Sequence, residues 1–254
     1  MPLNGMLVYP VGSTPACRYA AAFLAKAEIA LVDHPTPDAT HLLLDVPSFK
    51  PDGSLRGGGE IREVLRMLPA GITVVGGNLN SQDLRNHRTM DLLRDAQYLS
   101  ANAAITADCA LRVAAGPLCT TFSDSPALIL GWGRIGKCLA QLLKTIGTEV
   151  TIAARKETDR AMAAALGYRA IDIPHIRSQL PGCRLVFNTV PESVLSEADT
   201  AANAHCLYID LASKRGILGD GVIEARGLPG IHTPESSGKL ICETILRLSR
   251  EGSS

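Results

Sequence analysis

ALILGWGRIGKCLAQLLKTIG, residues 127–147, is the stretch that decides the fold of this chain. An apolar run ends in the glycine-rich segment Gly131–Gly136, and apolar residues then recur at the spacing of one helix face. This order predicts a buried strand, a tight turn and an amphipathic helix. A GxGxxG turn between a strand and a helix is typical of a dinucleotide-binding site; a purely structural turn is the alternative.

Each residue of this turn has an expected task. Gly131 permits the sharp change of direction, Gly133 lets a pyrophosphate approach the main chain, and Gly136 lets the helix pack closely on the strand. Arg134 and Ile135 begin the helix, where free N–H groups and the positive end of the helix dipole favour a phosphate. We therefore expect these five residues to bind the cofactor.

The end of the next strand bears on which cofactor is used. The sequence predicts that strand over Glu149–Ala154, and Arg155 and Lys156 follow it. NAD enzymes usually place Asp or Glu here for the ribose 2′-hydroxyl, whereas two cations attract the 2′-phosphate of NADP. We therefore expect NADP as the cofactor. NAD stays the alternative, because Glu157 lies close enough in sequence to reach the ribose and the cations suit a solvated turn.

Two further predicted strands end in polar segments, residues 188–191 and 210–214. Ligands of open α/β sheets bind beyond the carboxyl ends of the strands. The expected cofactor contacts there are Thr189, Val190 and Pro191, and the expected catalytic residues are Asn188, Ser213 and Lys214. Lys214 suits acid–base work or contact with a substrate carboxylate, and Asn188 suits orientation of the substrate or of the nicotinamide carboxamide.

Two more side chains are candidates, each with a plainer alternative. His232 lies in the segment GLPGIHTPESSG and is a candidate for proton transfer. Arg18 opens the first predicted helix, a place suited to holding a substrate carboxylate, although a solvated helix charge explains it equally well. Asn188 and Ser213 also fit ordinary turn residues, and Lys214 fits a surface charge.

The remaining sequence predicts an α/β protein with two α/β domains, of which the C-terminal one is a Rossmann domain with a mostly parallel sheet. Strand and helix patterns alternate through the first half, as parallel sheets covered on both faces require. The expected divisions are an N-terminal α/β domain at 1–100, an interdomain helix at 101–120, a Rossmann domain at 121–240, and a C-terminal helix and tail at 241–254. Residues 81–100 suggest a helix or an excursion.

Composition excludes several classes of function. The 254 residues are 46% hydrophobic and carry a formal net charge of zero. The sequence therefore lacks the excess of positive charge that is typical of nucleic-acid-binding proteins. No apolar run approaches the roughly 20 residues needed to span a bilayer, and the N-terminus does not resemble a signal peptide. The seven cysteines form no CxxC pair, which predicts buried thiols in a reducing cytoplasm and no metal site.

Five motifs then occur in a recognisable order: GWGRIG, AARK, NTVP, DLASK, and GLPG followed by a proline and SSG. This set resembles the A subunit of dipicolinate synthase from about Ala127 to the end of the chain. Residues 102–107 are similar to that family's interdomain helix, and the N-terminal half is similar only in layout. The layout is also that of 2-hydroxyacid dehydrogenases and methylene-tetrahydrofolate dehydrogenases.

The resemblance implies an NADP-dependent oxidoreductase with two α/β domains around a cofactor cleft. It implies formation of dipicolinate from a hydroxy-tetrahydrodipicolinate-type intermediate, a small dicarboxylate substrate, a role in sporulation and, as partner, a flavoprotein-like B subunit. We also expect a homo-oligomer. The nicotinamide would take up two electrons as hydride, while the protein supplies orientation and electrostatics.

The chain departs from the family pattern in four places. The first turn, residues 12–18, lacks the aspartate of a GGDxR motif, and the acid of the interdomain helix is replaced near Asp108. The segment after Lys214 is shortened, and Glu235 stands where lysine is usual. These departures leave two alternatives open: a related NAD(P)-dependent dehydrogenase acting on another small carboxylic acid, or a non-catalytic cofactor-binding partner subunit.

Overall fold

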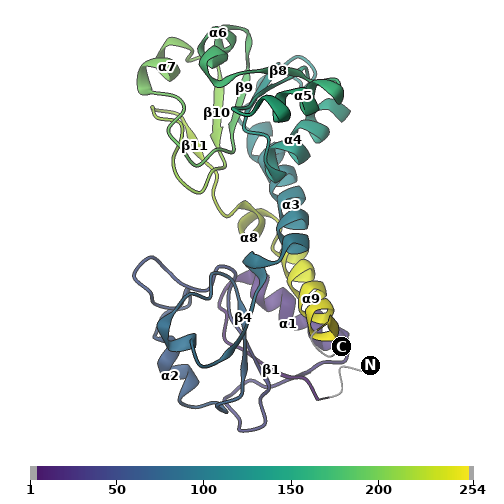
Figure 1. Ribbon diagram of the computed structural model, residues 1–254, viewed down its shortest axis with the longest axis vertical. Helices are drawn as coiled ribbons and strands as arrows, with labels where there is room; N and C mark the ends of the chain where they lie inside the picture. The colour runs from purple at the N-terminus through teal and green to yellow at the C-terminus, as the bar shows by residue number, and fades with distance from the viewer. Residues whose placement is uncertain (1–4, 252–254) are drawn as a thin grey trace. The chain divides into compact units, whose positions relative to one another are not determined.

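The computed structural model describes residues 5–251 and divides the chain into two compact units. The N-terminal unit comprises the chain up to Asn102 together with the chain from Pro229, and the C-terminal unit comprises Ala103–Leu228. Each unit contains one sheet whose strand pairs are all parallel. The predicted α/β class with parallel sheets is therefore confirmed (Figure 1).

The sheet of the N-terminal unit has the strand order β2-β1-β3-β4-β5. Its strands are β1 (Leu7–Pro10), β2 (Ala30–Leu31), β3 (His41–Leu43), β4 (Thr73–Gly76) and β5 (Arg88–Asp91). The helices are α1 (Pro15–Lys26), α2 (Ile61–Leu65) and α9 (Pro234–Glu251), with short 3-10 turns at Gln82–Leu84 and Leu92–Arg94. The chain thus returns to its first unit to end as α9.

Apolar clusters cover both faces of this sheet. Alternate residues of each strand point to opposite sides, so they belong to different clusters. In the run Leu42-Leu43-Leu44, Leu43 packs on the side of α1 and α9, whereas Leu42 and Leu44 pack with α2. Helices α1 and α9 lie side by side (Figure 1). Gly238 makes this contact possible, since a Cβ there would lie 2.7 Å from the carbonyl oxygen of Ala16.

The sheet of the C-terminal unit has the order β11-β10-β9-β6-β7-β8. Its strands are β6 (Ala127–Leu130), β7 (Val150–Ala153), β8 (Arg169–Ile171), β9 (Leu185–Asn188), β10 (Leu207–Asp210) and β11 (Ile223–Glu224). The helices are α4 (Arg134–Thr145), α5 (Glu157–Ala165), α6 (Ile176–Gln179) and α7 (Glu197–Ala202), with 3-10 turns at Ile173–His175 and Leu180–Gly182. Taken from β8 to β11, this is the strand order of a Rossmann domain.

Two apolar clusters cover the faces of this second sheet. Ile129 and Phe187 face one cluster, which includes Leu139 and Leu143 of α4. Leu128 and Leu130 of β6 and Val186 of β9 belong to the other cluster. That cluster also includes Ile176 of α6. All four residues of β6, β7 and β9 are buried, as expected for central parallel strands.

Helix α3 (Ala96–Ala115) carries the chain from the first unit into the second, and α8 (Leu228–His232) spans the second division. The interdomain helix therefore begins earlier than residue 101: it starts at Ala96, where the Asp95 carboxylate accepts the amide hydrogen of Tyr98. The second unit ends at Leu228 rather than at residue 240, because the last helix packs on α1. Strand β5 is not predicted by the sequence, since Arg-Thr-Met-Asp has no apolar run.

The segment after Lys214 leads to β11 without a helix: among the described residues 211–222, which join β10 to β11, there is none. Within residues 5–251, no helix is long and apolar enough to cross a membrane.

Candidate functional site

The glycine-rich turn lies at the point where the strand order of the second sheet reverses. Strand β6 pairs with β7 on one side and β9 on the other, with Leu130 opposite both Ala153 and Asn188. A parallel sheet opens a crevice at such a switch point, beyond the carboxyl ends of its strands. The segments that follow β6, β7 and β9 all leave the sheet at this edge. They are therefore the segments that a ligand would contact.

The three glycines of the turn have different surroundings. Gly131 has φ +103°, and a Cβ there would lie 2.5 Å from Thr189 Oγ1. Gly136 lies against the turn itself, where a Cβ would collide with the carbonyl oxygen of Gly131. Around Gly133, no described atom lies within 4 Å of the Cβ position. Two glycines are thus required by the fold, whereas the third leaves open space beside the main chain.

The N-terminus of α4 faces this open space without an internal acceptor. Gly133 is the N-cap residue, and within the described chain no side chain accepts from the first turn of the helix. That turn contains no acidic residue; Arg134 is exposed and Ile135 is half-buried. Free N–H groups, the helix dipole and a nearby guanidinium together fit a pyrophosphate. The residues present therefore fit the phosphates of a dinucleotide.

Thr189 and Val190 fix the turn from the neighbouring strand. The Thr189 hydroxyl and amide both donate to the carbonyl oxygen of Leu130, at 2.9 Å each. A Cβ on Gly131 would lie 2.8 Å from a methyl group of Val190. Pro191, next in the chain, is exposed. The structure thus brings these predicted residues together around Gly131.

Asn188 is fully buried and its side chain is used inside the protein. Its amide nitrogen donates to the carbonyl oxygen of Val190 at 3.0 Å and to the carboxylate of Asp210 at 2.9 Å, and its oxygen accepts from the Val190 amide. Both amide hydrogens are therefore taken. The geometry makes Asn188 a positioning residue that joins two loops, rather than a residue that touches substrate, because it has neither surface nor a free donor.

Asp210, at the end of β10, holds the loop that carries Ser213 and Lys214. This fully buried carboxylate accepts from Asn188 and from the amides of Ala212, Gly216 and Ile217, at 2.6–3.1 Å. Charge-assisted bonds of this kind fix a backbone firmly. Ser213 and Lys214 are both exposed at the bend of the loop. Within residues 5–251, no ion pair holds the Lys214 ammonium group.

Gly216 explains how closely the loops after β9 and β10 approach each other. A Cβ at this position would collide with the amide nitrogen of the Asn188 side chain and would lie 2.5 Å from the carbonyl oxygen of Glu192. The two loops also meet in a parallel bridge between Leu195 and Ile217. The segments that follow β9 and β10 are therefore one packed substructure.

Arg155 and Lys156 follow β7 as predicted, and both are exposed. The guanidinium of Arg155 forms an ion pair with Glu192, in which Nη1 lies 3.7 Å from a carboxylate oxygen. Glu192 is also exposed. Lys156 is the N-cap residue of α5. The two cations are thus near the crevice, and one of them already has a negatively charged neighbour.

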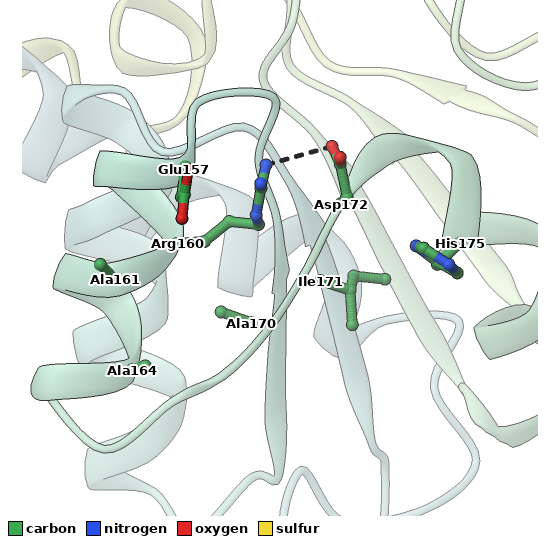
Figure 2. Close-up of a pocket in the computed structure, with 8 residues that line it drawn as sticks. All are labelled: Glu157, Arg160, Ala161, Ala164, Ala170, Ile171, Asp172 and His175. Carbon is green, nitrogen blue, oxygen red and sulfur yellow. Dashed lines mark ion pairs between the residues drawn. The ribbon is translucent and has the colours of Figure 1, made fainter.

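The main chain at the end of β7 is held by Arg160, from the first turns of α5. Its Nη1 donates to the carbonyl oxygens of Ala154 and Arg155, at 2.8 and 2.7 Å. The same nitrogen lies 3.1 Å from the Asp172 carboxylate, and Figure 2 shows the guanidinium directed toward that acid. Arg160 therefore fixes the backbone from which the Arg155 side chain leaves.

Both residues of this ion pair line an open hollow of about 520 Å³, and Figure 2 labels the residues around it. Its walls are α5 and the end of β8, with Ala161, Ala164 and Ala170 among the lining residues. Glu157, the ribose contact of the NAD alternative, lines this hollow rather than pairing with Arg155. None of the lining residues comes from the glycine turn, so the hollow is separate from the crevice at the end of β6.

In the N-terminal unit, the turn after β1 is closed by an internal carboxylate. The buried Asp45 accepts hydrogen bonds from the amides and hydroxyls of Ser13 and Thr14. A cavity of about 180 Å³ beside it is lined by the turn, Asp45 and Arg56. Arg18 is exposed and donates to the carbonyl oxygen of Ser13 at 2.7 Å. The first turn, which has no acid of its own, is thus held by a carboxylate two residues beyond β3.

The thiols of the chain are mostly buried, as expected. Desolvation raises the pKa of Cys17 to about 12, with the nearby Asp45 charge adding to the effect. Burial likewise raises the pKa of Cys183 and of Cys242 to about 11. A thiol held protonated in this way is a poor nucleophile.

His232, the candidate for proton transfer, is the last residue of α8. It is exposed and belongs to the N-terminal unit.

Sequence reasoning missed three residues with structural roles: Arg160 and Glu192 at the strand ends of the C-terminal unit, and Asp45 at the first turn of the N-terminal unit. Asp45 ends an apolar run, LLLD, which is a visible signal for a polar residue at a strand end. Glu192 follows the NTVP motif, but its approach to Arg155 depends on the pairing order of three strands. Arg160 is one of several charges on α5, and its role depends on the direction of its side chain. Only the first had a signal in the sequence.

No protein-family model and no curated protein matches the chain. Its fold is similar to that of the A subunit of dipicolinate synthase from Bacillus halodurans, with a TM-score of 0.83, 21% identity, and 97% of this chain and 98% of that chain covered. The A chain of dipicolinate synthase from Bacillus subtilis gives 0.81 and 19%, covering 98% and 97%. Transhydrogenase from Sinorhizobium meliloti gives 0.72 and 13%, covering 95% and 92%. The fold expected from the motifs is therefore confirmed across both units.

Proposed function

We propose that this chain binds a nicotinamide dinucleotide at Gly131–Gly136 and works as an NAD(P)-dependent oxidoreductase. The observation that carries the proposal is the open N-terminus of α4, at the switch point of a sheet in Rossmann order. Gly133 leaves room for the pyrophosphate, and Arg134 adds a positive charge. Thr189, Val190 and Pro191 would border the cofactor from the next strand. The solved structures of similar fold include a transhydrogenase, which supports the same class.

The substrate proposed is a small dicarboxylate, and the reaction is the one implied by the likeness to dipicolinate synthase. Converting a hydroxylated tetrahydropyridine dicarboxylate into dipicolinate requires loss of water and removal of two electrons, and a bound nicotinamide supplies the hydride acceptor. Lys214 is proposed to bind a substrate carboxylate or to move the proton, with Ser213 beside it. Asp210 holds the backbone of their loop through the amides of Gly216 and Ile217, so little backbone ordering is needed when substrate binds.

Nucleotide binding is the first test, and the chain has a convenient reporter. Its single tryptophan, Trp132, lies inside the glycine turn, and its emission overlaps the absorption of reduced nicotinamide. Titration with NADH and NADPH should quench the Trp132 signal and give saturable heats in calorimetry. If neither nucleotide binds to folded protein, the oxidoreductase proposal is rejected.

Turnover is the second test. The purified protein, supplied with oxidised NADP or NAD, the cyclic intermediate and a flavoprotein-like B subunit, should form dipicolinate and water while the nicotinamide is reduced by hydride. Replacement of Lys214 by Gln should lower turnover strongly while nucleotide titrations stay unchanged. Replacement of the exposed Lys239 in α9 by Gln is the matched loss of one positive charge. Equal turnover in both variants would contradict the role of Lys214.

A second candidate function is a related dehydrogenase acting on another small carboxylic acid. The first turn supports it, because it lacks the aspartate of the GGDxR motif and its Ser13 and Thr14 donate instead to Asp45. A changed first turn is a plausible basis for a changed substrate. A screen of small hydroxy and keto acids, followed by nicotinamide absorbance, separates the two functions. Tight nucleotide binding with no turnover of any acid, alone or with a B subunit, would instead indicate a non-catalytic partner subunit.

A further inference from the structure

We propose that Glu192 sets the choice between NADP(H) and NAD(H) by competing with the 2′-phosphate for Arg155. This inference rests on the proposed function, because it concerns the adenosine end of the same nucleotide site. Arg155 follows β7, the strand end where Rossmann proteins recognise the ribose 2′ position. Cations at this strand end favour NADP, and Arg155 together with Lys156 is why the sequence alone leads to NADP as the expected cofactor.

Glu192 reaches Arg155 from the other side of β6. Strands β7 and β9 flank β6, so the segments that follow them are two strand spacings apart, roughly 10 Å. The side chains of Arg155 and Glu192 span this separation, and their charged atoms come to 3.7 Å. The carboxylate therefore stands where the 2′ substituent of the adenosine ribose would meet Arg155.

The two cofactors should respond to Glu192 in opposite ways. A phosphate monoester carries roughly −1.5 to −2 charge at neutral pH, so a 2′-phosphate must displace Glu192 from Arg155 and then tolerate its charge. A 2′-hydroxyl can instead donate a hydrogen bond to the carboxylate, as the acid of an NAD site accepts one. Arg155 thus attracts the 2′-phosphate only to the extent that Glu192 releases it.

The backbone segments that carry Arg155 and Glu192 are both held by contacts within the protein. Gly216 packs closely on the carbonyl oxygen of Glu192, and Arg160 holds the carbonyl of Arg155. Both side chains are thus attached to fixed backbone while their charged groups stay exposed at 76% and 65%. Exposed pairs of this kind are separated easily, so we expect a graded effect on selectivity rather than exclusion of either cofactor.

The test measures dissociation constants for NADPH and NADH by Trp132 quenching and calorimetry, without turnover. Glu192→Gln should tighten NADPH binding by roughly two- to fivefold and leave NADH binding equal or weaker. Glu149→Gln is the matched control, because Glu149 is exposed, carries the same charge, and lies at the opposite end of β7. Circular dichroism checks that all variants fold.

A double-mutant cycle tests whether Glu192 acts through Arg155. In the Arg155→Gln background, the gain in NADPH binding from Glu192→Gln should largely disappear. An undiminished gain in that background, or an unchanged NADPH-to-NADH ratio in Glu192→Gln, would overturn the competition. Absence of binding by either nucleotide to the unsubstituted protein would count against the proposed function instead, so the two failures can be told apart.

Discussion

The turns that follow β1 and β6, the first strand of each sheet along the chain, are built alike. Their N–H donors are occupied inside the protein in the first turn and open in the second. After β1, Gly12 is packed so closely that a Cβ would lie 2.9 Å from the Asp45 amide nitrogen, and after β6 a Cβ on Gly131 would lie 2.5 Å from Thr189 Oγ1. In the first turn, Thr14 caps α1 and Asp45 takes the free donors. In the second turn, the start of α4 has no such acceptor among the described residues.

The difference comes from the residue that the neighbouring strand contributes. Strand β3, beside β1, leads to a buried carboxylate, Asp45, which accepts from the amides of Ser13 and Thr14 just before α1. Strand β9, beside β6, ends in the neutral Asn188, whose side chain turns toward Asp210 instead. A strand–turn–helix unit offers backbone N–H groups to an anion, and in these two turns the residue that follows the neighbouring strand decides whether those groups are already occupied.

The largest expected effect comes from the two carboxylates. Asp45→Asn and Asp210→Asn should each lower the free energy of unfolding by about 2–4 kcal/mol, because a donor group would then face backbone N–H groups that lose their acceptor. Only Asp210→Asn should also weaken nucleotide binding, since Asp210 supports the segments beside the glycine turn. Urea unfolding and NADH titration measure the pair. Equal effects of both variants on NADH binding would contradict the proposed contrast between the two turns.

The glycines of the second turn give the next effect. Gly131→Ala should destabilise the protein by about 1–3 kcal/mol, because alanine at positive φ is strained and its Cβ would meet Thr189. Gly133→Ala should cost less, about 0.5–1 kcal/mol, because its φ of −78° is ordinary and the space is open, and only the poorer N-cap preference of alanine counts against it.

Binding should separate these two glycine variants further. Gly133→Ala should weaken NADH binding roughly tenfold or more, because its Cβ would occupy the place of the pyrophosphate. Thermal unfolding and Trp132 quenching are the measurements. Unchanged NADH affinity in Gly133→Ala would mean that the open space beside α4 does not receive the phosphates.

The cap of α1 gives a smaller effect. Thr14→Ala removes the side chain that accepts from the Cys17 amide and donates to Asp45. Loss of an N-cap should lower the free energy of unfolding by about 1 kcal/mol. Thr14→Ser keeps the hydroxyl and should restore most of the stability. NADH affinity should be the same in both variants, and a loss in Thr14→Ala alone would show that the first turn is not simply closed.

The smallest expected effect is a pH dependence of the N-terminal unit. Burial lowers the pKa of His41 from its usual 6.5, so the folded protein takes up this proton less readily than the unfolded chain. Between the lowered pKa and 6.5 the unfolded state binds more protons, and stability therefore falls as the pH falls through that range.

Replacement of His41 by Gln measures the size of this pH effect. Urea midpoints between about pH 7.5 and 5 should decline less steeply in His41→Gln than in the unsubstituted protein. Identical slopes would show that His41 contributes nothing to the acid sensitivity.

Much of the fold could be predicted because its signals are local. The runs Ala127–Leu130 and Val150–Ala153 are recognisable as strands from their mainly apolar residues, and the structure buries every one of them. Positive φ at Gly131 and close packing at Gly136 followed from the GxGxxG pattern. Strand β5 could not be predicted, since its four residues are exposed or half-buried and pair with β4 only after the sheet has formed.

By itself, the sequence determined the α/β class, the alternation of strands and helices, and the position of the glycine turn, because these depend on spacing and on the conformational range of glycine. Tertiary structure alone decided that Asn188 is buried, that Asp45 closes the first turn, and that Glu192 meets Arg155. Each of these is a contact between segments brought together by the order of strands in a sheet. That order is set by packing across the whole unit, so residues distant in the chain become neighbours only when the sheet is complete.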